Sequence, residues 1–426
     1  MVQIHGIRRA SADAKYRQMT GQPVKPLILK LCLPAVISNL VTTAYNLTDT
    51  FFIGQLGTAQ SGAIGIAFSI MTVMQALGFF FGNGAGNSMS RELGKQNNDR
   101  ASRLLAVGFA GAVLSGLVIA TIGLLTLRPL VVMLGSTSTI APYAVQYLTP
   151  LLVAAPCVCG SFALNGLLRY QGQSAFGMIG LVSGALLNFL LAPLFIFVAG
   201  LGIFGAGLAT AICQTVSFTI LTTMSRKFGV MKLSLRNCKP DMLLMREVAG
   251  GGLPSLIRQG AGSISVTCVN IAANPFGDAA IAGMAIVMRI MLGANSVIVG
   301  LGQGFQPVCG YNYGAGLFAR VKEGYWFCVR LATCVLVALA ALHIQCCTVI
   351  LNGFNMMGNM MTQTMGRTGI ASFLALCRQG LFLAPIVLIL PMMFGVLGVE
   401  MAQSVSDVLT FLVTIPFMRR ILHELR

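Results

Sequence analysis

The residues best suited to chemistry lie on the first apolar segment of the chain and end at a carboxylate. Four polar residues recur there at intervals of three and four, so a helix would place them on one face: Asn39, Thr42, Asn46 and Asp49. A carboxylate withdrawn from water favours its neutral form, so Asp49 can exchange a proton or hold a cation. Pro34 precedes this polar stripe and can bend the helix by interrupting its hydrogen bonds. We expect proton or cation coupling at Asp49 with Pro34 as a hinge; a polar packing stripe is the alternative.

Further ionisable residues lie in the apolar segments of the second half. Glu400 is near the end of the last segment, where we expect a solvated interfacial carboxylate, and Asp407 lies deeper in the same segment. Three arginines can reach the interface or pair with Asp407 in structural roles: Arg258, Arg289 and Arg378. The candidate residues of a substrate cavity are Asn39, Thr42, Gln259 and Asp407.

The sequence contains no constellation typical of an enzyme, a metal site or a bound cofactor. The 12 cysteines lack metal-like spacing, and the 3 histidines are far apart in the sequence. Glycine-rich stretches at 82–86 and 302–316 resemble phosphate loops superficially, but neither follows a strand or ends in Gly-Lys-Ser/Thr. Small residues in such stretches commonly allow close helix packing instead. We therefore expect no enzymatic activity, no metal and no cofactor apart from a coupling ion.

The elements that must position these residues are membrane helices. Hydrophobic residues make up 56% of the chain and charged residues only 9%, whereas soluble domains carry about 25% charge. Lys and Arg outnumber Asp and Glu by 28 to 11, but almost all of them lie in short loops, as the positive-inside rule describes. This distribution places the N-terminus in the cytoplasm, and the first apolar segment does not resemble a cleaved signal peptide. We expect a multi-pass protein of the lipid bilayer that binds no nucleic acid.

The chain also contains an internal repeat. Residues 33–100 align without a gap on residues 253–320, at a constant offset of 220, and residues 202–218 match residues 395–411 at an offset of 193. Two homologous halves in a membrane chain are typical of transporters in which two helix bundles face each other across a substrate site. We expect an N-terminal lobe over 1–225, a basic cytoplasmic linker over 226–246 and a C-terminal lobe over 247–426.

The second half is shorter than the first. Arg100 and Asn165 are 65 residues apart, whereas their repeat partners Arg320 and Asn359 are 39 apart, a deficit of 26. A single helix of this length would measure roughly 58 Å, about twice the hydrocarbon thickness. Two short spans fit the charges better, because they keep the basic C-terminus inside. We expect an all-α protein with twelve spans in two six-helix bundles, the second shortened near 335–346 by a natural deletion or an omitted segment.

Several segments resemble the multidrug and toxic compound extrusion (MATE) family, and within it the prokaryotic MepA-like branch. The resemblance rests on LPAVISNLVTTAYNLTDTFFIGQLG at 33–57, ALLNFLLAPLFIF at 185–197, GIFGAGLATAICQ at 202–214 and LGQGFQPVCGYNYGAG at 301–316. It implies two bundles related by a pseudo-twofold axis, a central cavity, and alternating access driven by a proton or sodium gradient. It also implies export of cationic and amphipathic drugs.

The resemblance carries specific residues as well. Pro34 and Asp49 match the first-helix proline and aspartate of the family, while Asn188 and Thr210 match an asparagine and a threonine of its N-lobe cation network. Ala192 stands where that network has a second aspartate, and Arg258-Gln259 stands where some branches carry an acid. Loss of the second acid weakens a sodium site and favours coupling to protons, with sodium at Asp49, Asn188 and Thr210 as the alternative.

We therefore expect a monomeric secondary antiporter in the cytoplasmic (inner) membrane of a prokaryote, with both termini in the cytoplasm. It would exchange cationic or amphipathic small molecules against H+ or Na+, with Asn39, Asn46, Asn188 and Thr210 orienting Asp49. One alternative is a flippase of the same superfamily for a lipid-linked anionic sugar, which the arginines of the second half partly suit. Another is a degenerate family member that does not transport, in keeping with Ala192 and the shortened repeat.

Overall fold

A computed structural model describes residues 2–231, 233–234, 237–238, 241–273, 278–340, 346–394 and 396–425, and in these ranges the chain is helical without any strand. Among the described residues, 7 helices are long and apolar enough to cross a membrane, or 8 if the bent pair α6 (Ala141–Val153) and α7 (Ala155–Tyr170) forms one span. Apolar residues over such lengths bury their backbone hydrogen bonds within the helix, as the bilayer requires. The predicted all-α membrane class is confirmed.

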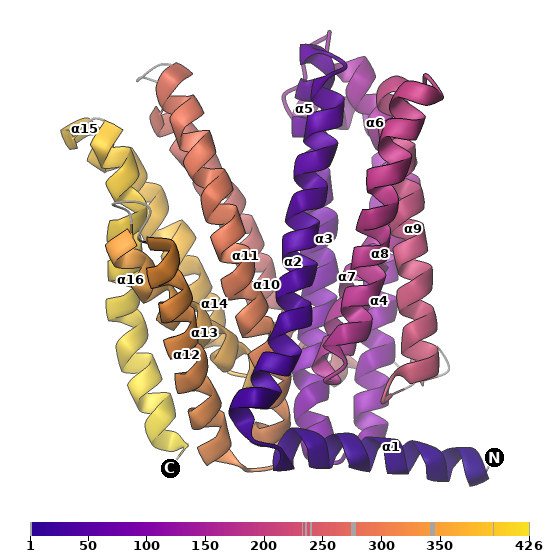
Figure 1. Ribbon diagram of the computed structural model, residues 1–426, viewed down its shortest axis with the longest axis vertical. Coiled ribbons are helices and arrows are strands. Elements are labelled where there is room, and N and C mark those ends of the chain that lie inside the picture. Colours follow the sequence, from indigo (N-terminus) through magenta and orange to yellow (C-terminus); the bar gives the residue numbers. More distant parts are fainter. Residues whose placement is uncertain are drawn as a thin grey trace.

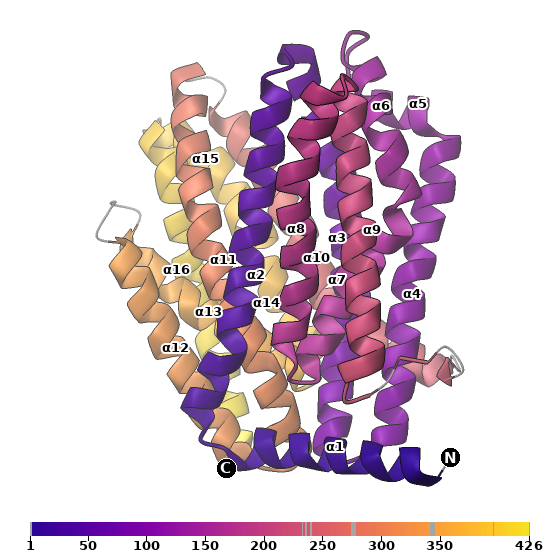
Figure 2. The ribbon, with the colours of Figure 1, turned by 45° about the vertical axis from the view of Figure 1, so that its right-hand side comes forward.

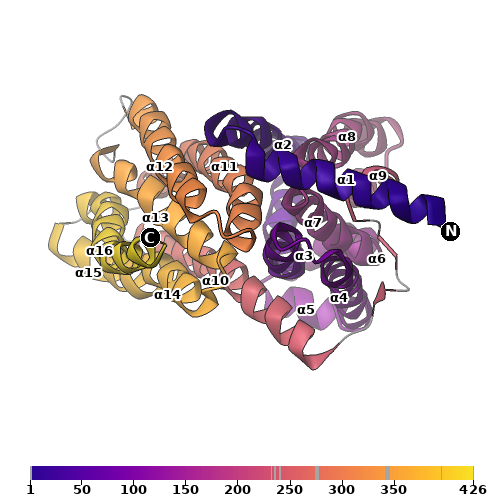
Figure 3. The same ribbon diagram turned by 90° about the horizontal axis from the view of Figure 1, so that it is seen from below.

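Among the described residues, the bundle has twelve long helical segments when bent or π-extended helices are counted as one and the helices that fall short of this criterion for a span are included, and the first half contributes six of them. They are α2 (Val24–Gly54), α3 (Thr58–Gly94), α4 (Asn98–Leu125), the α6–α7 pair, α8 (Ser174–Pro193) with its π-helical extension η1 (Leu194–Val198), and α9 (Gly202–Phe228). A short helix, α5 (Leu127–Met133), lies between α4 and α6. Figure 3 shows these helices as one group, beside a second group formed by the helices from α10 (Met242–Ala273) to α16 (Val396–Glu424).

The second half contributes the other six segments. They are α10 (Met242–Ala273), α11 (Asp278–Gly314), α12 (Phe318–Ala340), α13 (Cys346–Thr364), a span made of α14 (Thr368–Leu376), η4 (Cys377–Leu383) and α15 (Ala384–Phe394), and α16 (Val396–Glu424). The turns between helices are equivalent in the two halves. Gly172 before α8 and Gly366 before α14 have φ of 74° and 83°, a left-handed conformation that glycine adopts without strain.

Small residues bring the two halves together near one end of the bundle. A Cβ atom on Gly84 of α3 would lie 2.2 Å from the Val248 oxygen and 2.9 Å from the Gly252 nitrogen of α10. A Cβ atom on Gly304 of α11 would lie 2.5 Å from Cα of Cys32 on α2. The offset of 220 relates Gly84 to Gly304 and Cys32 to Gly252. The two contacts are therefore equivalent, and the sequence repeat forms a pseudo-twofold interface.

The helix α1 (Val2–Gly21) lies across this same end of the molecule, which we call the basal face (Figure 1). The C-terminus lies at the basal face too, and the ribbons of α11 and α15 diverge from α2 toward the opposite end (Figure 1). The α1 helix contacts both halves. Asn312 of α11 donates its side-chain amide to the Met19 oxygen at 3.1 Å, while Lys15 and Met19 lie against Gly172.

Polar bridges reinforce the basal contact between the halves. Glu247 at the start of α10 accepts from Arg91 at 3.2 Å and from Arg100 at 2.8 Å. Deeper in the membrane, Asn83 of α3 donates to the Ser255 hydroxyl of α10 at 3.0 Å. These bonds join segments more than 140 residues apart in the sequence (|i−j| of 147 to 172) and stabilise the closed basal arrangement.

The region predicted to hold two short spans contains two separate helices, α12 and α13, so that prediction is confirmed. The residues between them, 341–345, lie outside the described residues. Ala340 corresponds to Ala120 at the offset of 220, and Cys346 corresponds to Leu152 at the offset of 194 that relates Asn359 to Asn165. The residues that the second half lacks are therefore the counterparts of the end of α4, of α5 and of most of α6. Figure 2 agrees, because α12 extends less far from the basal face than α4 and α5 do.

Candidate functional site

Asp49 is buried among the helices of the first half, with 6% of its surface exposed. Asn188 of α8 donates its side-chain amide to Asp49 Oδ1 at 2.7 Å, and Thr210 Oγ1 of α9 lies 3.4 Å from Oδ2. The Thr210 hydroxyl also lies 3.1 Å from the Ala206 oxygen, and its single proton can be donated to only one of the two acceptors. The hydrogen bond from Asn188 is therefore the stronger of the two contacts to Asp49. The fold thus brings together three of the predicted site residues from three separate helices.

This carboxylate has few other oxygen partners. Ala192 lies one turn beyond Asn188 on α8 and is buried, but its methyl group offers no ligand. Oδ1 of Asn188 is buried without a hydrogen-bond partner. In the part of the chain that the structure describes, no group of three or more His, Cys, Asp and Glu side chains could hold a metal ion. The site is therefore one carboxylate held by neutral amide and hydroxyl groups.

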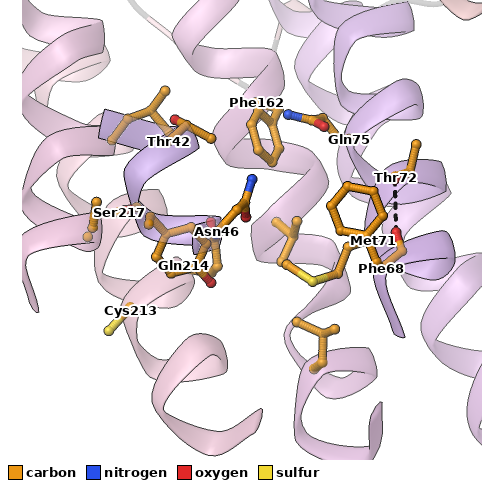
Figure 4. A pocket seen from close by; sticks show the side chains of 16 residues that line it. Thr42, Asn46, Phe68, Met71, Thr72, Gln75, Phe162, Cys213, Gln214 and Ser217 are labelled. Atoms are coloured by element: carbon orange, nitrogen blue, oxygen red, sulfur yellow. Dashed lines mark hydrogen bonds between the residues drawn. The ribbon is translucent and has the colours of Figure 1, made fainter. Parts of the chain in front are cut away.

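An amphipathic pocket of the first half is lined by Asn46, which precedes Asp49 by one turn of α2 (Figure 4). Thr42 and Asn46 of α2 line it, and so does Cys213 of α9, one turn after Thr210. Figure 4 shows the Asn46 amide and the Phe162 ring beside the same space. Its other polar and apolar walls include Phe68, Met71, Thr72, Gln75, Gln214 and Ser217. A lining of aromatic, thioether and amide groups suits an organic molecule with both apolar and polar parts.

Asn39 belongs to a different contact. Its side-chain amide donates to the Ser296 oxygen and to Gln303 Oε1 of α11, both at 3.3 Å. Asn39 and Asp49 are separated by ten residues, which turns them about 80° apart around a helix. The residues of the predicted stripe therefore face two directions. Asp49 faces the interior of the first half, while Asn39 faces the second half.

Pro34 lies inside α2, which continues as a helix from Val24 to Gly54. Ser38 Oγ donates to the Pro34 oxygen at 2.8 Å, and Cys32, half a turn before the proline, is the residue that touches Gly304. Any bend at Pro34 would thus begin beside a fixed contact between the halves. The role of Pro34 as a hinge stays a prediction.

In the second half, Asp407 of α16 is 2% exposed and forms an ion pair with Arg378 of η4, with Nε 2.9 Å from Oδ1. The predicted pairing of an intramembrane arginine with Asp407 is confirmed for Arg378. Gln259 lies on α10 next to Arg258 and is partly buried. The side chains of Arg289 and Glu400 lie outside the described residues.

One buried charge was not anticipated from the sequence. Arg169 at the end of α7 is only 3% exposed, donates to Asn83 Oδ1 at 3.0 Å and stacks over the Tyr170 ring at 5.3 Å. An arginine at the end of an apolar segment is typical of the membrane interface. Only the packing of α7 against α3 reveals that this one is turned inward.

Apolar helical spans in two related halves, with the buried Asp49 carboxylate near an amphipathic pocket, define a membrane transporter. The chain belongs to the MatE family, whose model matches residues 34–194 and residues 254–409, once in each half. The resemblance inferred from the sequence motifs is thereby confirmed.

Similar proteins include curated multidrug exporters. The chain is 26% identical to the multidrug export protein MepA of Staphylococcus haemolyticus, over 89% of this chain and 90% of the relative. It is 25% identical to MepA of Staphylococcus aureus, over 93% of both chains. Among solved structures, an outward-facing multidrug resistance MATE transporter superimposes with a TM-score of 0.90 at 22% identity, over 96% of this chain and 98% of the other. That last similarity shows the shared fold.

Proposed function

We propose that the protein is a secondary antiporter that exports cationic or amphipathic small molecules in exchange for protons. The observation that carries this proposal is the buried Asp49 carboxylate, held by Asn188 and Thr210 beside the pocket of the first half. A buried carboxylate is costly to keep charged without a counter-charge. It gains from a proton, or from a cationic substrate, and occupancy by one disfavours the other.

The geometry at Asn188 favours protons over sodium as the coupling ion. An ionised Asp49 accepts from the Asn188 amide, as the structure has it. A protonated Asp49 would donate, and rotation of the amide by half a turn presents Oδ1, which has no other hydrogen-bond partner, as the acceptor. Both protonation states are thus satisfied in place. A sodium ion would need several oxygens, and Ala192 supplies none.

We further propose that the lobes 1–225 and 247–426 alternate in their opening, with Pro34 as a hinge of α2. The basic segment that joins them and the basic residues before α2 would place the basal face and both termini in the cytoplasm. The location would be the inner membrane of a prokaryote. Both lobes of the transport unit are present in one chain, so a monomer would suffice.

The test is efflux of ethidium from energised cells or inverted vesicles, with the pH and sodium gradients collapsed separately. Efflux should stop when the pH gradient is removed and persist when the sodium gradient is removed. The variant Asp49→Asn should lose gradient-coupled efflux while its membrane expression is unchanged. Asp99→Asn makes the same chemical change at an exposed basal position and serves as the control. Wild-type efflux by Asp49→Asn would refute the role of Asp49, and loss with sodium alone would refute proton coupling.

A further inference from the structure

A second pocket lies in the second half, at the position equivalent to the pocket beside Asp49. It is lined by side chains of α10, α13, α14, η4 and α16, which are the repeat counterparts of α2, α7, α8 and α9. Arg258, Arg378 and Asn359 are among the lining residues, with Thr410 and Thr414 on the side of α16. The pseudo-twofold relation between the halves therefore extends from their interface to their interior pockets.

The second pocket has arginines in its lining, whereas the lining of the pocket in the first half contains no charged residue. Arg258 stands at the repeat position of Ser38, and Asp407 at that of Gln214. Arg258 and Arg378 both line the pocket, and Nε of Arg378 is paired with Asp407. Among the described lining residues there is no carboxylate, so Arg258 and Arg378 with Asp407 leave one uncompensated positive charge.

Arg258 also has an unused hydrogen-bonding group. Its Nη1 atom is buried and has no hydrogen-bond partner. Nearly all buried polar groups in folded proteins are paired, and an unpaired guanidinium nitrogen in a membrane interior is expensive. A ligand that accepts hydrogen bonds and carries negative charge would satisfy both the free nitrogen and the excess charge.

We propose that the pocket of the second half binds an anionic oxygen group of the transported molecule, a carboxylate or a phosphate-type oxyanion. Arg258 is its main ligand, and the part of the Arg378 guanidinium not bonded to Asp407 is the second. This proposal rests on the proposed function in assuming that the occupant is transported, and it extends the substrate class to zwitterions. A cationic end would then use the first half and an anionic end the second.

The test uses two dyes that differ in one carboxylate. Rhodamine B has a free carboxylate, and its ethyl ester has the same rings with the carboxylate blocked. Binding of each dye is measured by fluorescence anisotropy on the purified full-length protein in detergent. The variant Arg258→Gln should weaken rhodamine B binding by about ten-fold or more, because it removes a charge-assisted hydrogen bond, and should leave the ester within about two-fold. Arg330→Gln, at an exposed arginine of α12, is the matched control.

The variant Asp407→Asn provides a change of opposite sign. It removes the charge that neutralises Arg378, so rhodamine B should bind more tightly, whereas the cationic ester should gain nothing or bind more weakly. A merely structural cluster would not produce this selective gain. Equal loss of both dyes in Arg258→Gln would show a packing role and overturn the proposal. Unchanged rhodamine B binding in both variants would overturn it as well.

Nanodiscs then identify the source of the anion. If anionic phosphatidylglycerol, but not zwitterionic phosphatidylcholine, displaces rhodamine B from the wild type and not from Arg258→Gln, the pocket takes a lipid phosphate. If neither lipid competes, it takes the carboxylate of a soluble substrate. These measurements use no ion gradient, so loss of the proposed antiport function in the ethidium assay would leave their outcome unaffected.

Discussion

Replacement of Gly84 by alanine should push the two halves apart at the basal face. The added Cβ atom would lie 2.2 Å from the Val248 oxygen, which is backbone and cannot rotate away. The helices α3 and α10 must therefore separate locally by about 1 Å, and overpacking of this kind costs about 1–3 kcal/mol. That cost corresponds to a shift of about 5- to 150-fold in the ratio of separated to closed basal arrangements. Gly304→Ala should have a similar effect, because its Cβ atom would meet Cα of Cys32 at 2.5 Å.

The assay is a distance measurement by pulsed electron resonance between spin labels at Asp99 and Ala319. Both are exposed, and the offset of 220 makes them equivalent positions on the two halves. The control is Gly65→Ala, also on α3, where a Cβ atom would meet nothing within 4 Å. Longer distances in Gly84→Ala and Gly304→Ala, but not in Gly65→Ala, are expected. Distance distributions that match the wild type in both interface variants would show that glycine is not needed for closure.

Two other predictions concern the basal face. Glu247→Gln removes the carboxylate that accepts from Arg91 and Arg100, and should favour basal separation by about 1 kcal/mol after allowance for solvent screening, or about five-fold. The same spin labels measure it, with exposed Glu323→Gln as the control; an effect of equal size in both variants would contradict a specific bridge. Burial, together with the nearby charge of Lys30, lowers the pKa of Lys15 to about 8, so the docked α1 disfavours the ammonium form. Docking should be weakest below pH 8 and strengthen as the pH rises from 8 toward the ordinary lysine pKa of 10.5. Hydrogen exchange of α1, corrected for intrinsic rates, should slow over that range, and Lys15→Met should abolish the change; a pH-dependence that survives in Lys15→Met would assign it to another group.

Much of the architecture follows from local properties of the sequence. Apolar runs of sufficient length must form helices in a bilayer, because their backbone groups have no other partners. The gapless match of residues 33–100 with 253–320 predicted two related halves, and the contact of Gly84 with Gly252 and of Gly304 with Cys32 is the same relation in space. The deficit of 26 residues also predicted that the second half lacks an element. The same alignment identifies the missing residues as the counterparts of α5 and most of α6.

The division of the polar stripe on α2 needed the tertiary structure. Helical spacing alone groups Asn39 with Asp49, yet neighbouring helices decide what each side of the stripe touches. Asn39 meets Gln303 of α11, whereas Asp49 meets Asn188 of α8. Periodicity describes directions around one helix and contains no information about which helix lies in each direction.

By itself, the sequence determined the helical class, the repeat and the family, and it predicted Asp49 as the carboxylate that exchanges a proton. The tertiary structure decided which buried charges have partners: Asp49 with Asn188, Asp407 with Arg378, Arg169 with Asn83, and Arg258 with one nitrogen unpaired. These partners lie 29 to 139 residues apart in the chain. The energy of a buried charge depends on groups within a few ångströms, and packing between distant helices, unlike helix formation, sets those distances.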